Sequence, residues 1–134
     1  MTNSIIFKNL LFGFLSWLIP FGISCLFYNR NGELLISYDL FKSLMIVVGS
    51  VSGCYFLYLY FKILERNYIW NGIIVGIAWF LINIILDFFI LIPMMKTTFI
   101  NYFMTIGLRY TVIIIISTTF GYLLHQKRIS KTTL

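Results

Sequence analysis

The chain has 134 residues, of which 60% are hydrophobic and only 10% are charged, and its formal net charge is +6. In a water-soluble domain about a quarter of the residues are Asp, Glu, Lys or Arg, so this composition excludes a soluble fold. With only two Cys and two Pro, it also excludes a disulfide-stapled secreted domain and a Pro-rich disordered chain. We therefore expect a small integral membrane protein.

Four apolar stretches have the length that a membrane-crossing helix needs, which is about 20 residues for about 30 Å of hydrocarbon. Strands are excluded because the stretches are too long and do not alternate between apolar and polar residues. The fold we expect is an all-α, antiparallel bundle of four transmembrane helices, made of two helical hairpins in a single domain, residues 1–134. The predicted spans are at about 7–28, 40–63, 69–93 and 102–124, followed by a short basic cytoplasmic tail at 125–134.

Pro20 lies inside the first predicted span. Proline has no backbone N–H, and its ring clashes with the carbonyl four residues earlier, which here belongs to Ser16. We therefore expect the first helix to be kinked at Pro20.

The distribution of Lys and Arg predicts the orientation, because cytoplasmic segments carry the excess of positive charge. Lys8, Lys62, Arg66, Lys127, Arg128 and Lys131 share the side of the termini, whereas Arg30, Lys42 and Lys96 lie on the other side. We expect both termini to be cytoplasmic and the protein to lie in the cell membrane, plasma or inner. Topology and anionic lipid headgroups account for the positive charge, and binding of nucleic acid is not expected.

Two opposite charges lie within the third and fourth predicted spans. Asp87 precedes Met94 by seven residues and Arg109 follows Tyr102 by seven, so both lie about 10 Å below the outer surface. A lone charge at the bilayer centre costs about 2.5–3.5 kcal/mol on insertion scales, and a neighbouring opposite charge relieves this cost. The sequence therefore predicts an Asp87–Arg109 ion pair, with Asn83 one helical turn away as a hydrogen-bond partner.

Ser16, Ser24 and Lys42 are predicted to lie in or above the same outer layer of the membrane. Together with Asp87, Arg109 and Asn83 they predict a polar pocket that opens outward and binds a small polar or ionic solute. The alternative interpretation is structural, because an ion pair between two helices also fixes their register.

Small residues predict where helices approach closely in a membrane. The third and fourth spans are expected to cross through such residues in their inner halves, and the second span offers another small-residue face to a neighbouring helix or another copy. These residues are Gly72 and Gly76 in the third span, Ser117 and Gly121 in the fourth, and Gly49 and Gly53 in the second.

Two further patterns each leave two interpretations open. The stretch from Gly22 to Cys25 resembles the end of a lipoprotein cleavage box, although that box usually has Leu where this chain has Gly22, and Cys25 is otherwise a packing residue. At a fixed offset of 62 residues, Trp17 matches Trp79, and several other pairs of residues match as well. These matches indicate either that one half of the chain duplicates the other or that a chain rich in a few residue types matches itself by chance.

The chain offers no predicted catalytic or metal site. It has a single His, no Glu within a span and no facing Cys and His, so we expect neither an enzyme nor a cofactor nor a bound metal. Two functions remain. The first is a transporter or channel-like module, working as a homo-oligomer because four helices enclose little space. The second is a non-transporting accessory, assembly or immunity-type subunit of a larger membrane complex, in which the Asp87–Arg109 pair is purely structural.

Overall fold

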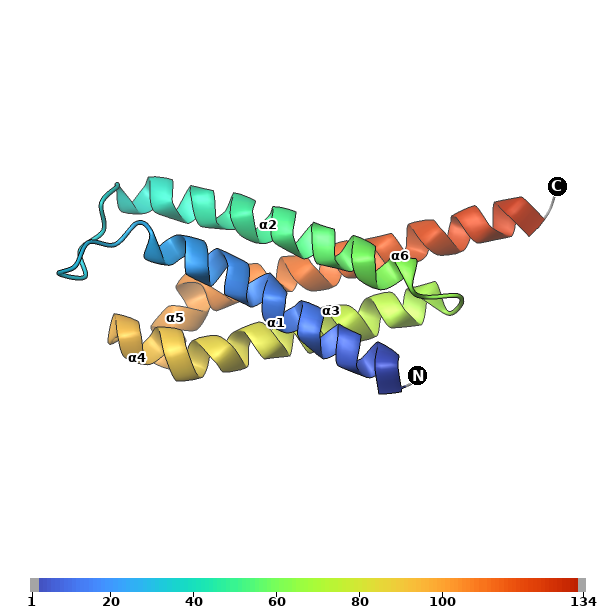
Figure 1. Ribbon diagram of the computed structural model, residues 1–134, viewed down its shortest axis with the longest axis horizontal. Coiled ribbons are helices and arrows are strands. Elements are labelled where there is room, and N and C mark those ends of the chain that lie inside the picture. Colours follow the sequence, from blue (N-terminus) through green and yellow to red (C-terminus); the bar gives the residue numbers. More distant parts are fainter. Residues whose placement is uncertain (1–2, 133–134) are drawn as a thin grey trace.

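The computed structural model describes residues 3–132 and is almost entirely helical (Figure 1). Four long helices are joined by short loops and by a stretch of irregular helix between the third and the fourth. The long helices are α1 (Asn3–Cys25), α2 (Tyr38–Lys62), α3 (Tyr68–Leu86) and α6 (Thr111–Thr132). The irregular stretch contains a π-helical turn η1 (Asp87–Leu91), α4 (Ile92–Met95), α5 (Phe99–Thr105) and a 3₁₀ turn η2 (Gly107–Tyr110).

Within residues 3–132, four helical segments are long and apolar enough to cross a membrane, as the sequence predicts. They are Asn3–Cys25, Tyr38–Lys62, Tyr68–Met95 and Gly107–Ser130. The fourth begins later than expected because α5 is a separate short helix. Residues 125–132 of the predicted tail belong to α6, which continues as a helix to Thr132. Residues 133–134 of that tail lie outside the described part of the chain. Helix α1 continues through Pro20 from Asn3 to Cys25, and the kink stays a prediction.

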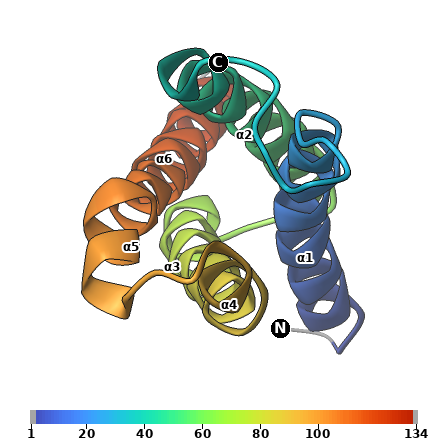
Figure 2. The same cartoon turned by 90° about the vertical axis from the view of Figure 1, so that its left-hand side faces the viewer.

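The two ends of the molecule differ in what they contain (Figure 1). The left-hand end carries the loop 26–37 together with α4 and α5, and we call it the loop end. The right-hand end carries the start of α1, the loop 63–67 and the end of α6, and we call it the termini end. Viewed from the loop end, α1, α2, α3 and α6 are arranged around a common centre (Figure 2).

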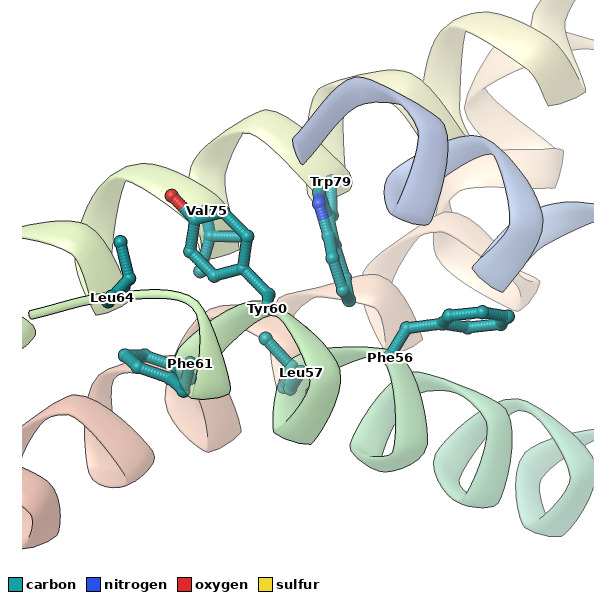
Figure 3. Close-up of a cluster of buried hydrophobic side chains, with 7 residues drawn as sticks. All are labelled: Phe56, Leu57, Tyr60, Phe61, Leu64, Val75 and Trp79. Atoms are coloured by element: carbon teal, nitrogen blue, oxygen red, sulfur yellow. The ribbon is translucent and has the colours of Figure 1, made fainter. Parts of the chain in front are cut away.

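The apolar core lies between α2 and α3, toward the termini end. Side chains from the last turns of α2 and from the loop that follows it face two side chains of α3 (Figure 3). The cluster consists of Phe56, Leu57, Tyr60, Phe61, Leu64, Val75 and Trp79. Tyr60 is fully buried, and its hydroxyl finds no hydrogen-bond partner among the described residues. The core fills the bundle at this end and leaves the space near the loop end to be lined by other residues.

A tryptophan joins α3 to α1 next to this core. The Trp79 indole Nε1 donates to the Asn9 side-chain oxygen at 2.7 Å and to the Asn9 carbonyl at 2.9 Å. Gly13 makes this approach feasible, because a Cβ at that position would lie 2.8 Å from both the Trp79 ring and the Ile82 side chain. The pair fixes the position of α1 along α3.

Glycines also allow α3 and α6 to cross closely. A Cβ at Gly72 would lie 2.6 Å from the Ser117 carbonyl oxygen, and one at Gly76 would collide with the Ser117 hydroxyl. Gly121 lies against the Tyr68 carbonyl in the same way. The structure thus brings the small residues of the third and fourth spans together across one crossing.

Candidate functional site

The Asp87 carboxylate is the centre of a buried hydrogen-bond cluster. Trp17 Nε1 donates to Oδ1 at 2.7 Å, and the Tyr102 and Tyr110 hydroxyls donate to Oδ2 at 2.5 and 2.7 Å. Asp87 is only 1% exposed, so these three donors replace the water that an exposed carboxylate would bind. The cluster joins α1, η1, α5 and η2.

Irregular helix turns place the members of this cluster. Asp87 is the first residue of the π-helical turn, and Tyr110 is the last residue of the 3₁₀ turn. On one straight helix, Tyr102 and Tyr110 would lie about 12 Å apart along the axis. The break between α5 and α6 brings both hydroxyls to a single carboxylate oxygen. Such departures from α-helical geometry are frequent at functional sites.

The structure contradicts the expected ion pair between Asp87 and Arg109, since no salt bridge joins these two described residues. Both Asp87 oxygens already accept hydrogen bonds from neutral donors, and Arg109 lies on the 3₁₀ turn instead of on a regular helix. Asn83 also differs from its expected role, because its amide donates to the Trp79 carbonyl at 2.8 Å. Arg109 precedes Tyr110, which reaches Asp87, but the Asp87 carboxylate is stabilised by Trp17 and the two tyrosine hydroxyls and not by the guanidinium.

A cavity of about 340 Å³ lies between the four long helices, toward the loop end. It extends from Tyr28 and Tyr38 at its outer rim to Leu57 of the core, and its walls are mostly apolar. The structure places all the residues of the predicted polar pocket along this cavity: Asp87, Arg109, Asn83, Lys42, Ser16 and Ser24. That they bind a solute stays a prediction.

Three uncharged polar side chains of the cavity, Ser16, Ser24 and Asn83, form hydrogen bonds within their own helices. The Ser16 hydroxyl donates to the Gly13 carbonyl at 2.7 Å, and the Ser24 hydroxyl donates to the Phe21 carbonyl at 2.6 Å. With Asn83 and Asp87 also engaged, these groups offer a ligand few free donors. The charges in the cavity that have no hydrogen-bond or ionic partner among the described residues are therefore those of its two cations.

Lys42 and Arg109 are half-buried and line the cavity from different helices. The Lys42 ammonium lies 4.3 Å from the centre of the Tyr38 ring, a cation–π contact. Neither side chain has a hydrogen bond or an ion pair with the residues that the structure describes. Burial and the proximity of Tyr38 and Cys25 raise the pKa of the Tyr28 hydroxyl at the rim, so Tyr28 stays neutral and supplies no counter-charge.

The small-residue face of α2 also lines this cavity. A Cβ added at Gly49 or Gly53 would have no neighbouring atom within 4 Å. These glycines therefore do not serve as a contact with another helix of this chain, which is one of the two roles expected for them. They widen the cavity, and a contact with another copy stays a prediction.

Sequence reasoning missed the three partners of Asp87, although depth along the helices could have indicated one of them. Trp17 lies eight residues before the end of α1 at Cys25, and Asp87 lies eight residues before the end of α4 at Met95. Both are therefore about 12 Å from the same end of the bundle. Tyr102 and Tyr110 could not be assigned to one carboxylate without the break between α5 and α6.

The chain has no significant match among protein-family models, curated proteins or solved structures.

Proposed function

We propose that the protein is a small transporter or channel-like module that binds a small anionic solute in its cavity, within an antiparallel bundle of two helical hairpins. In this proposal the protein lies in the plasma or inner membrane of the cell. Its loop end faces outward, and both termini lie in the cytoplasm. One observation carries the proposal. Lys42 and Arg109 line one cavity from two helices, and neither has an ionic partner among the described residues.

Two cations beside a mostly apolar cavity create a positive potential that water screens poorly. The only carboxylate among the cavity-lining residues is Asp87, whose oxygens are occupied by Trp17, Tyr102 and Tyr110. A bound anion would supply the missing counter-charge and accept hydrogen bonds from the ammonium and the guanidinium. The geometry thus supports an anion over a cation or a neutral solute.

The apolar core at the termini end closes the cavity toward that end of the bundle. This supports a module whose cavity is open to only one side of the membrane at a time. Trp79, Phe56 and Leu57 fill the space below the cavity. Transport would need this core to open or the pathway to be completed between copies of the chain. We therefore expect the transporting form to be a homo-oligomer or part of a larger membrane complex.

Binding to the purified protein in nonionic detergent tests the proposal. Equilibrium dialysis with radiolabelled phosphate, sulfate and small carboxylates is expected to reveal binding of at least one of these anions. Lys42→Gln and Arg109→Gln should each weaken it at least tenfold. Lys96→Gln and Arg30→Gln are matched controls, because these exposed cations do not line the cavity. Absence of saturable anion binding to the folded protein would reject the proposal.

A second candidate function is the accessory, assembly or immunity-type subunit. It is favoured by the Asp87 cluster, in which one carboxylate ties α1 to α5 and η2 with every oxygen occupied. In that case the cavity is a by-product of helix packing. Normal folding of Lys42→Gln and Arg109→Gln, no anion binding and co-purification with another membrane protein would favour this candidate.

A further inference from the structure

We infer that the ligand of this cavity is an anionic membrane lipid, whose phosphate lies between Lys42 and Arg109 and whose acyl chain passes between α2 and α6. This inference rests on the proposed anion site and names its ligand class. It uses three features that the anion site alone does not explain: apolar walls, cations placed near the helix ends, and an opening toward the bilayer.

The walls of the cavity suit hydrocarbon. Beyond the two cations, the cavity is lined along α2 and α6 by apolar or small side chains that include Met45, Gly53, Ile113 and Ile116. A small hydrated anion gains nothing from such walls, because apolar surface offers it no hydrogen bonds. An acyl chain loses nothing there, since it exchanges contacts with lipid for contacts with protein.

The two cations lie within reach of the layer where lipid phosphates lie. Lys42 is in the second turn of α2, which begins at Tyr38, and Arg109 lies in η2 just before α6 begins. Lys42 is therefore near the membrane-water interface at the loop end. Arg109 lies deeper, beside Tyr110 at the level of Asp87, and its long side chain can extend toward the same headgroup layer. A phosphate there would neutralise both charges without being drawn to the bilayer centre.

The exposure of cavity-lining residues on α2 and α6 points to an opening between these two helices. These helices meet toward the termini end, where the rings of Phe61 and Phe120 stack with centroids 6.2 Å apart, and they cross in Figure 1. Nearer the loop end, Ile46 and Val112 line the cavity and still expose 49% and 46% of their surface. In a membrane this opening faces acyl chains, so a chain can enter the cavity without leaving the bilayer.

The volume fits this mode of binding. Pockets for small ligands have volumes of about 300–1,000 Å³, and the cavity, at about 340 Å³, lies at the small end. A headgroup with the beginning of one chain is a better match than a whole lipid. The rest of the lipid would stay in the bilayer, outside the opening.

The test compares phosphatidylglycerol with phosphatidylcholine of identical chains, both in nanodiscs holding the protein, and detects retained lipid by native mass spectrometry. We expect at least fivefold more phosphatidylglycerol than phosphatidylcholine on the wild type. Lys42→Gln and Arg109→Gln should each reduce this preference to about one. Gly53→Leu should reduce retained phosphatidylglycerol at least fivefold by filling the apolar part of the cavity. Val51→Leu, on the exposed outer face of α2, should change nothing.

Glycerol phosphate, the soluble counterpart of the headgroup, separates the inference from the proposed function. It should bind the wild type and Gly53→Leu equally, within twofold, through the two cations. If it binds while the protein shows no preference for phosphatidylglycerol, the site takes a soluble anion and the lipid inference is wrong. If neither binds, the proposed function fails as well.

A second measurement covers the case in which Gly53→Leu does not fold. Phosphatidylglycerol with a diazirine on its chain is photolysed in nanodiscs with the wild-type protein. Cross-links concentrated in residues 46–54 and 112–116 support the inference. Cross-links spread over the outer faces of α1 and α3, as expected for ordinary surrounding lipid, overturn it.

Discussion

Trp17 and Asp87 are 70 residues apart in the sequence and are joined by a 2.7 Å hydrogen bond from the indole to the carboxylate. Trp79 and Asn9 are also 70 residues apart and are joined by a 2.7 Å hydrogen bond from the indole to the side-chain amide oxygen. The two bonds lie eight residues apart along the chain on both sides and hold α1 in one register against α3 and the η1 turn that follows it. The first bond also positions Asp87 at the cavity, so the helix packing and the candidate site depend on the same residue.

The Asp87 cluster predicts different costs for two substitutions of this residue. Asp87→Leu leaves one indole N–H and two hydroxyls buried without an acceptor, at about 1–3 kcal/mol each. Asp87→Asn keeps one acceptor oxygen and should cost about half as much or less. Unfolding in mixed micelles of nonionic detergent and sodium dodecyl sulfate, followed by circular dichroism, measures both. Equal losses for the two variants would show that the donors do not depend on this carboxyl group.

The Trp17–Asp87 bond is expected to appear as an energetic coupling. Trp17→Phe should lower the free energy of unfolding by about 1–2 kcal/mol in the wild type, but by much less in an Asp87→Ala background. Trp70→Phe is the control, because Trp70 is 69% exposed and should change stability by less than about 0.5 kcal/mol. A Trp17→Phe effect of the same size in both backgrounds would mean that the indole acts through packing alone.

Replacing glycine by alanine should lower the stability of the protein at one kind of position and raise it at another. Gly72→Ala places a methyl group against the Ser117 backbone, which cannot move aside, and should destabilise the protein by about 1–3 kcal/mol. Gly49→Ala meets open space and gains helix propensity of up to about 1 kcal/mol. Thermal unfolding of both variants tests this contrast. A stable Gly72→Ala protein would contradict the close crossing of α3 and α6.

Tyr60→Phe should stabilise the protein by about 1 kcal/mol. The Tyr60 hydroxyl is buried and has no hydrogen-bond partner among the described residues, so its removal relieves a desolvation cost. The rest of the ring keeps its contacts in the core. Chemical denaturation of the variant beside the wild type measures the change. A loss of stability would show that this hydroxyl has a partner, such as a buried water.

The sequence predicted the part of the fold that depends on length and hydrophobicity. The four apolar segments follow from the span that a bilayer requires, and the meeting of Gly72, Gly76 and Ser117 follows from matching levels on neighbouring helices. The sequence also placed Lys42 above the layer of Arg109 at the same end of the bundle, and both line the same cavity. These inferences need only the rise per residue, which regular helices share.

The hydrogen bonds of the site could not be predicted from regular helices. The π turn at Asp87 and the 3₁₀ turn at Arg109 change the direction in which the following side chains point. An ideal helix therefore suggested a guanidinium as the partner of Asp87, whereas the actual partners are neutral donors on α1, α5 and η2. Opposite charge was the stronger signal in the sequence, but the local backbone decided which groups meet.

The most direct test of the anion site is solid-state NMR of the reconstituted protein with bound glycerol phosphate, measuring the dipolar coupling between phosphorus and ¹⁵N-labelled Lys and Arg side chains. We predict couplings at hydrogen-bonding distance to one lysine and one arginine, and each should disappear in Lys42→Gln or Arg109→Gln respectively. Coupling that persists in both variants, or that is lost instead in Lys96→Gln and Arg30→Gln, would contradict the assignment of the cavity as the anion site.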